Sequence, residues 1–165
     1  MPLFEKVMGE LKARETPPLL AQELYAEEVS RRLMSVPGEN VREELRRAAL
    51  LLWNDDLQAA HFIVQNDESA DAAFIHAIIH RREGDFSNAR YWWRRAASSS
   101  LFQKVGAALS PMPEVAEYAL LDAKGNFDEM RFTELCENAT PENEETLRRI
   151  QAAEMAALPP IFFAP

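Results

Sequence analysis

Apolar residues recur every three to four positions along most of this chain, which is the spacing of helices that bury one face. The pattern predicts helices over residues 2–12, 19–35, 41–53, 57–66, 69–82, 86–97, 114–123, 127–138 and 141–158. No segment shows the strict alternation of apolar and polar residues that is typical of a strand. The expected fold class is therefore all-α.

Local signals mark where these helices begin and end. Thr16-Pro17-Pro18 is expected to break the first helix, and Pro37-Gly38 to end the second. Asn40 is the expected N-cap of the third helix, with Glu43 at the third position of a capping box. Thr140-Pro141 predicts the start of the last helix, and Pro159-Pro160 its end.

Residues 53–60, 82–89 and 123–130 repeat a short polar turn that is followed by a bulky apolar residue. This unit resembles the helix-turn-helix of tetratricopeptide-type repeats, in which an Asp caps the second helix. The units start 29 and then 41 residues apart, whereas tetratricopeptide repeats keep a period of about 34. We expect stacked antiparallel helical hairpins, as a tetratricopeptide-like superhelix or an irregular bundle. One domain is expected over residues 1–165, with 1–18 as a candidate mobile segment and 159–165 as an apolar tail.

The chain has 165 residues and a net charge of −9. Such an acidic chain disfavours nucleic acid and anionic membrane surfaces as partners, because both attract Lys and Arg. No apolar run reaches the roughly 18 residues of a membrane span. Cys136 is the only cysteine, and the N-terminal residues lack the apolar region of a signal peptide. The expected location is the cytoplasm.

All three histidines lie between residues 61 and 95. At 100° per residue, His76, His80 and Glu83 share one side of their helix. The interpretation we favour is that both histidines hydrogen-bond to carboxylates in a helix interface, without a metal. The alternative is a divalent metal site with His76, His80 and Glu83 as ligands, completed by His61 or Asp85. The zinc-peptidase pattern is excluded, because no Glu follows His76.

The histidines are followed by Arg81 and Arg82. Gly84 is expected to end the helix, and Asp85 to cap the next one. The two arginines favour ion pairs with nearby acids, and the alternative is a site for a small anion.

Tyr91, Trp92 and Trp93 follow on the next helix. Because Trp92 and Trp93 point 100° apart, one of them is expected to line a groove between hairpins. Such a groove is a natural site for a peptide. The alternative is that both rings pack in the core.

The segments from Trp53 to Gln65 and from His76 to Arg95 resemble an uncharacterised family of small all-helical proteins. The later Phe132-Thr133-Glu134-Leu135-Cys136-Glu137 is similar to another motif of that family. The resemblance implies a fold and no particular reaction. This chain departs from the family pattern at Ile75, where an aromatic residue is typical, and at 96–98, where His-Pro is frequent.

Two functions follow as hypotheses. The first is a non-enzymatic helical module that binds a protein or peptide partner, or a second copy of itself. The second is a small enzyme or ligand-binding protein whose polar pocket is formed by His61, His76, His80, Arg81 and Glu83. Convergence of these side chains on one place would favour the second hypothesis.

Overall fold

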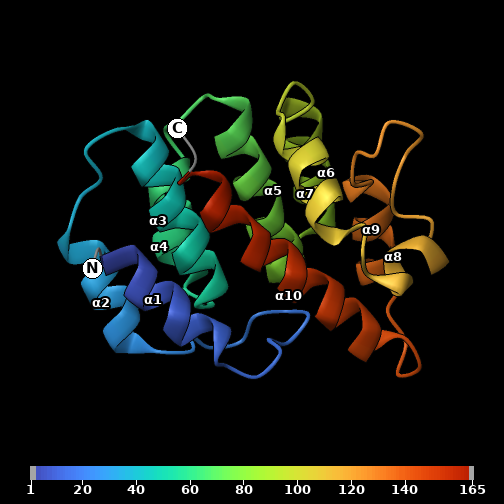
Figure 1. Ribbon diagram of the computed structural model, residues 1–165, viewed down its shortest axis with the longest axis horizontal. Coiled ribbons are helices and arrows are strands. Elements are labelled where there is room, and N and C mark those ends of the chain that lie inside the picture. Colours follow the sequence, from blue (N-terminus) through green and yellow to red (C-terminus); the bar gives the residue numbers. More distant parts are fainter. Residues whose placement is uncertain (1–2, 164–165) are drawn as a thin grey trace.

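The computed structural model describes residues 3–163, which are helical over most of their length (Figure 1). The helices of this range are α1 (Leu3–Lys12), α2 (Glu27–Ser35), α3 (Val41–Trp53), α4 (Leu57–Val64), α5 (Ala70–Glu83), α6 (Phe86–Arg95), α7 (Leu101–Leu109), α8 (Pro113–Glu117), α9 (Glu129–Glu137) and α10 (Glu144–Ile161). An isolated bridge between Leu121 and Phe127 is the only extended pairing among the described residues. The all-α prediction is confirmed.

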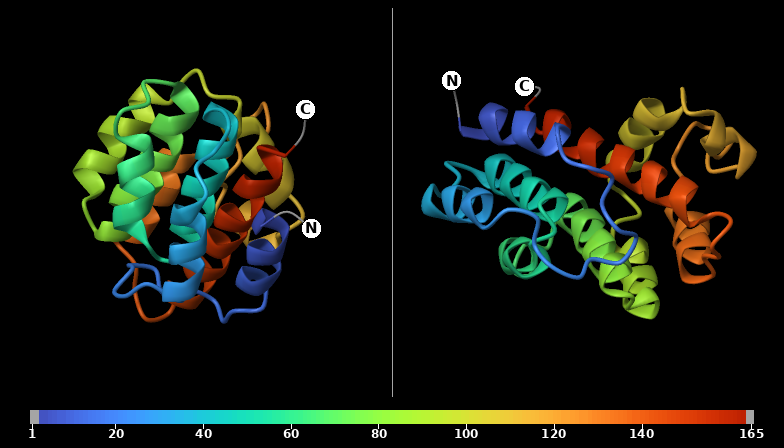
Figure 2. Two further views of the ribbon diagram at one scale, coloured as in Figure 1. Left: turned by 90° about the vertical axis from the view of Figure 1, so that its left-hand side faces the viewer. Right: turned by 90° about the horizontal axis from the view of Figure 1, so that it is seen from below.

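Helices α3 and α4 form one antiparallel hairpin and α5 and α6 form another, with α4 packed against α5. The long helix α10 crosses this array and packs along α3 and α7. Figure 2 shows α1 and α10 on the same side of the α3–α6 layer. Helix α5 is central, because every residue from 72 to 82 is buried. No helix in the described part of the chain is long and apolar enough to cross a membrane.

The two hairpins turn in the same way. Asp56 caps α4 and Asp85 caps α6, and in both cases the carboxylate accepts a hydrogen bond from the backbone three residues later. The residue before each cap has a positive φ, 61° at Asp55 and 80° at Gly84. Gly tolerates this conformation easily and Asp less so. The repeated sequence pattern therefore reports a shared turn geometry.

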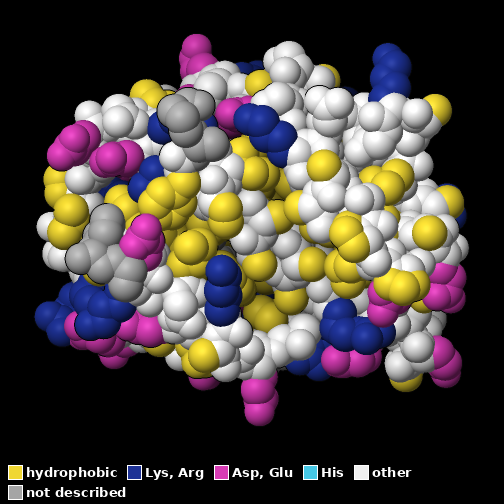
Figure 3. Space-filling view, viewed as in Figure 1, with side chains coloured by type: hydrophobic (Ala, Val, Ile, Leu, Met, Phe, Trp, Pro, Cys, Tyr) yellow, Lys and Arg dark blue, Asp and Glu magenta, His cyan; other side chains and the backbone are white. Residues whose placement is uncertain are grey.

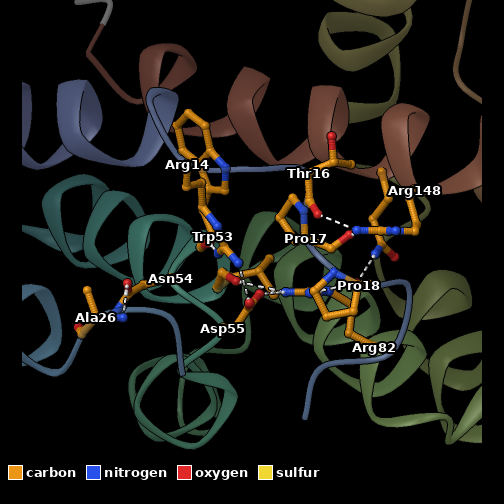
Figure 4. Close-up of polar contacts among 12 residues, drawn as sticks. Arg14, Thr16, Pro17, Pro18, Ala26, Trp53, Asn54, Asp55, Arg82 and Arg148 are labelled. Carbon is orange, nitrogen blue, oxygen red and sulfur yellow. Dashed lines mark hydrogen bonds and ion pairs between the residues drawn. The ribbon is translucent and has the colours of Figure 1, made fainter. Parts of the chain in front are cut away.

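The predicted helix over residues 19–35 is wrong in its first half, because α2 begins only at Glu27. Residues 13–26, here called the N-terminal strap, cross the ends of α3 and α5 without regular structure (Figure 4). The amide of Ala21 donates to the carbonyl of Arg82, and that of Tyr25 to the carbonyl of Asn54. These tertiary partners replace the hydrogen bonds that a helix would have formed.

Other boundaries also differ from the prediction. Helix α8 ends at Glu117 instead of residue 123, and α7 was not predicted. Helix α10 begins at Glu144, because residues 140–143 form a turn in which the Asn143 amide donates to the Thr140 carbonyl. It also continues past Pro159 and Pro160, whose fixed φ is compatible with a helix.

The apolar tail folds back onto its own chain. Phe162 is buried in the core, and Arg46 donates to its carbonyl at 2.8 Å. Arg42 donates to the carbonyl of Ile161 at 3.1 Å, so two of the arginines of α3 hold the end of α10. Pro2, Ala164 and Pro165, which belong to the predicted first helix and tail, lie outside the described residues.

Candidate metal site

His61 of α4 and His76 and His80 of α5 converge in the interface between the two hairpins. One side-chain nitrogen from each lies within 4.8 Å of the others. The ring centres are 4.5 Å apart for His61 and His76, and 4.9 Å apart for His76 and His80. His76 and His80 are buried, and His61 is half-buried. The face over α10 shows no histidine (Figure 3), so the cluster does not open on that side.

The hairpins place these rings by helix geometry and by small side chains. His76 and His80 are one turn apart, and their rings stack at an angle of 20°. Ala60 directly precedes His61, and Ala72 lies one turn before His76. Both are fully buried, and their small side chains allow helices to approach closely. Trp92 of α6 stacks on His76 at 3.8 Å. The Trp92 ring of α6 thus covers one side of the cluster.

Glu83 orients the His80 ring. Its carboxylate accepts a hydrogen bond from Nδ1 of His80 at 3.0 Å. This bond places the ring proton on Nδ1 and leaves a lone pair on Nε2. The side-chain amide nitrogen of Asn88 lies 3.3 Å from Nε2 and 3.4 Å from Nδ1. Because the amide nitrogen is nearly equidistant from the two ring nitrogens, it lies out of the plane of the His80 ring and not along the lone pair of Nε2.

His76 has a polar atom without a partner. Its Nδ1 is buried and makes no hydrogen bond, which is rare for a buried polar group. Burial, together with the neighbouring His61 and His80, lowers the pKa of His76 from 6.5 to about 3. At neutral pH the imidazole is therefore uncharged, as a metal ligand must be.

Three imidazoles in one place fit the ligand preferences of zinc, copper and nickel. Around a tetrahedral zinc ion the nitrogens lie about 3.3 Å apart, since each Zn–N bond is about 2.0–2.1 Å. The present cluster is somewhat wider. His61 is the ring with room to turn, because the other two are packed between helices.

The predicted ligand set changes in one respect. The structure brings His61 to His76 and His80. The Glu83 carboxylate instead accepts a hydrogen bond from Nδ1 of the His80 ring. Asn88, four residues after Gly84, was not singled out by the sequence. Its position in the first turn of α6 was the available signal, since the preceding turn brings that end of α6 back to the end of α5.

Arg81 lies away from the histidines. Its guanidinium group is fully buried between Glu129 of α9 and Glu154 of α10. Gln151 accepts a further hydrogen bond from Nε at 3.3 Å. The Phe132 ring lies 4.7 Å below the guanidinium carbon. The side chain joins three helices, and each of its three nitrogens donates to an acceptor of the fold.

Arg82 is also committed to the fold. It forms an ion pair with Asp55 at 2.6 Å and donates to the carbonyls of Leu52 and Pro18. Figure 4 shows Arg14 reaching the same Asp55 from the other side. These ion pairs fix Asp55 in its positive-φ conformation.

The remaining candidate residues either cap a helix, lie at the surface or are buried in the core. Asp85 caps α6. Tyr91 is exposed, and Trp92 is half-buried between Tyr91 and His76. Trp93 is buried and donates to Thr133 at 2.9 Å. Cys136 is buried, and burial raises its pKa to about 12, so its thiol keeps its proton.

No known protein family, curated protein or solved structure matches this chain.

Proposed function

We propose that this protein binds a divalent transition-metal ion through His61, His76 and His80. The convergence of three imidazole nitrogens within 4.8 Å carries this proposal. The unpaired Nδ1 of His76 and the carboxylate behind His80 support it. Metal-binding histidines usually donate a hydrogen bond from their other ring nitrogen to a carboxylate or carbonyl, as Nδ1 of His80 does to Glu83.

The alternative explanation is a helix interface in which the histidines only pack. That explanation accounts for the stacking of His76 on Trp92. It does not account for a buried nitrogen that lacks a partner, since such an atom costs about 1–3 kcal/mol. A metal ion bonded to this nitrogen would remove the cost.

The test is metal content of untagged protein by mass spectrometry, with a cobalt(II) titration followed by visible absorption. We expect near-stoichiometric metal in the wild-type protein and its loss in His61→Ala and His80→Ala. Gln58→Ala is the matched control, because Gln58 is an exposed residue of the same helix, one turn before His61. Circular dichroism checks that each variant is folded.

His61→Ala is the more informative variant, since His61 is half-exposed and its loss leaves the core intact. Wild-type protein that neither retains metal nor perturbs the cobalt spectrum would refute the proposal. Equal metal binding by wild type and His61→Ala would remove His61 from the site.

A second candidate function is self-association through the outer face of α6. Tyr91 is 49% exposed there, beside the exposed Arg94 and Arg95. In a chain of net charge −9 this basic and aromatic face complements the acidic surface of a second copy. Sedimentation of the wild type should show a dimer that dissociates with salt, and Tyr91→Ser should remain monomeric. A protein that stays monomeric at all concentrations would exclude self-association through α6.

The cytoplasmic location and the absence of nucleic-acid partners belong to the same proposal. They are supported by the single cysteine and the acidic charge. Fractionation of cells that express the protein tests the location.

A further inference from the structure

A metal held by the three histidines would have an incomplete shell. Zinc and cobalt take four ligands in tetrahedral sites. Among residues 3–163, no fourth His, Cys, Asp or Glu belongs to the cluster. Glu83 is the nearest carboxylate in the sequence, but it is bonded to Nδ1 of His80, and the metal ligand would be Nε2.

The residues beside the cluster are partly exposed to solvent. His61 is half-buried, and the Trp92 and Asn88 side chains beside the cluster are half-buried as well. Tyr91 packs edge-on against Trp92 and is exposed. The site therefore lies below the surface along α4 and α6, with a polar amide and an aromatic ring at its edge.

Asn88 has the chemistry to bind a ligand at that position. In the metal-free protein its amide nitrogen lies 3.3 Å from Nε2 of His80. The same nitrogen lies 3.4 Å from Nδ1, so the amide sits out of the ring plane and leaves the in-plane lone pair of Nε2 free for a metal. An N–H of the amide would then be available to a ligand beside the ion. The Arg95 guanidinium, 5.3 Å from the Trp92 ring centre, adds a positive charge at this edge.

We infer that the metal site keeps one coordination position for a small anion, and that the Asn88 amide donates a hydrogen bond to it. The expected ligands are monodentate anions such as azide, hydroxide or a simple carboxylate. The inference rests on the proposed function, because it requires the ion. Asn88 is a ligand-binding residue and not a metal ligand.

Azide is the probe, added to the full-length protein loaded with cobalt(II). We expect a saturable change in the visible cobalt bands, as azide enters the fourth position. Asn88→Ala should still bind cobalt but should bind azide about tenfold more weakly, since one hydrogen bond to an anion is lost. Ser87→Ala is the control, because Ser87 is an exposed neighbour on the same helix.

The outcomes separate the two proposals. Failure of cobalt to bind at all overturns the proposed function. Cobalt that binds without a spectral response to azide shows that the shell is closed and overturns the open position. An azide affinity of Asn88→Ala equal to that of wild type overturns the role of Asn88.

Discussion

The carboxylate of Glu83 determines how the His80 ring is presented. The two residues are three apart on α5, so they meet on the same helix face. The bond fixes the tautomer of His80 and leaves the lone pair of Nε2 available to a metal. Glu83 itself is exposed at the helix end, and its loss does not disturb the core.

Glu83→Gln should therefore weaken metal binding without unfolding the protein. A neutral amide accepts the Nδ1 proton less strongly, which lowers the basicity of Nε2. We expect metal affinity to fall about 10–100-fold. Competition with a chromophoric chelator measures the affinity, and Glu68→Gln, an exposed acid before α5, is the control. Equal affinities in the two variants would contradict this role.

The N-terminal strap shows how elements far apart in the sequence are joined. Arg148 of α10 donates to the carbonyls of Thr16 and Pro17 at 2.6 and 3.0 Å (Figure 4). Gln151, one turn later, donates to the carbonyl of Leu19 at 3.0 Å. Two cavities of about 270 and 510 Å³ flank the strap, so these polar bonds hold a segment that is not tightly packed.

Arg148→Ala should destabilise the protein by about 1–2 kcal/mol, since two hydrogen bonds from a charged donor are lost. Arg149 provides a matched control, because it follows Arg148 directly and forms a partly exposed pair with Glu114. Arg149→Ala should change the free energy of unfolding by no more than about 0.5 kcal/mol. Urea denaturation measures both. Equal losses would show that the strap bonds contribute nothing beyond a surface ion pair.

For the whole molecule, the buried group of Arg81, Glu129 and Glu154 joins α5, α9 and α10. Two carboxylates share one guanidinium group in a site with no solvent exposure. Burial raises the pKa of Glu129 well above 4.5, and the charge of Glu154 raises it further. A protonated Glu129 with an ionised Glu154 would balance the charge of Arg81.

Glu129→Gln should consequently be tolerated better than Glu154→Gln. At pH 7 we expect a loss within about 1 kcal/mol for the first, because Gln resembles a protonated Glu. The second should cost about 2 kcal/mol or more, because it removes a buried charge partner. Thermal and urea denaturation measure both. A larger loss for Glu129→Gln would assign the negative charge to Glu129.

The pH dependence gives an independent check on the same group. Unfolded Glu129 releases its proton near pH 4.5, whereas the folded protein retains it to higher pH. Stability from this residue is therefore lost as pH rises above about 4.5. Glu129→Gln lacks this loss, so its stability relative to wild type should improve between pH 5 and pH 8.

The sequence by itself determined the local structure. The Asn40 and Asp85 caps, the left-handed Gly84 and the helical spacing of His76 and His80 were all predictable, because each acts within one or two turns. The all-α class followed from the same periodicity. The boundaries failed where a distant segment supplied the hydrogen bonds, as Arg82 and Asn54 do for the strap.

Only the tertiary structure decided which polar residues meet. It brought His61 to the α5 histidines and placed Asn88 beside His80. It also buried Arg81 and Arg82 in ion pairs. The partners of Arg81 are 48 and 73 residues away. Helix periodicity gives the face on which a side chain lies. It cannot give the neighbour across the interface, because that depends on how whole helices pack.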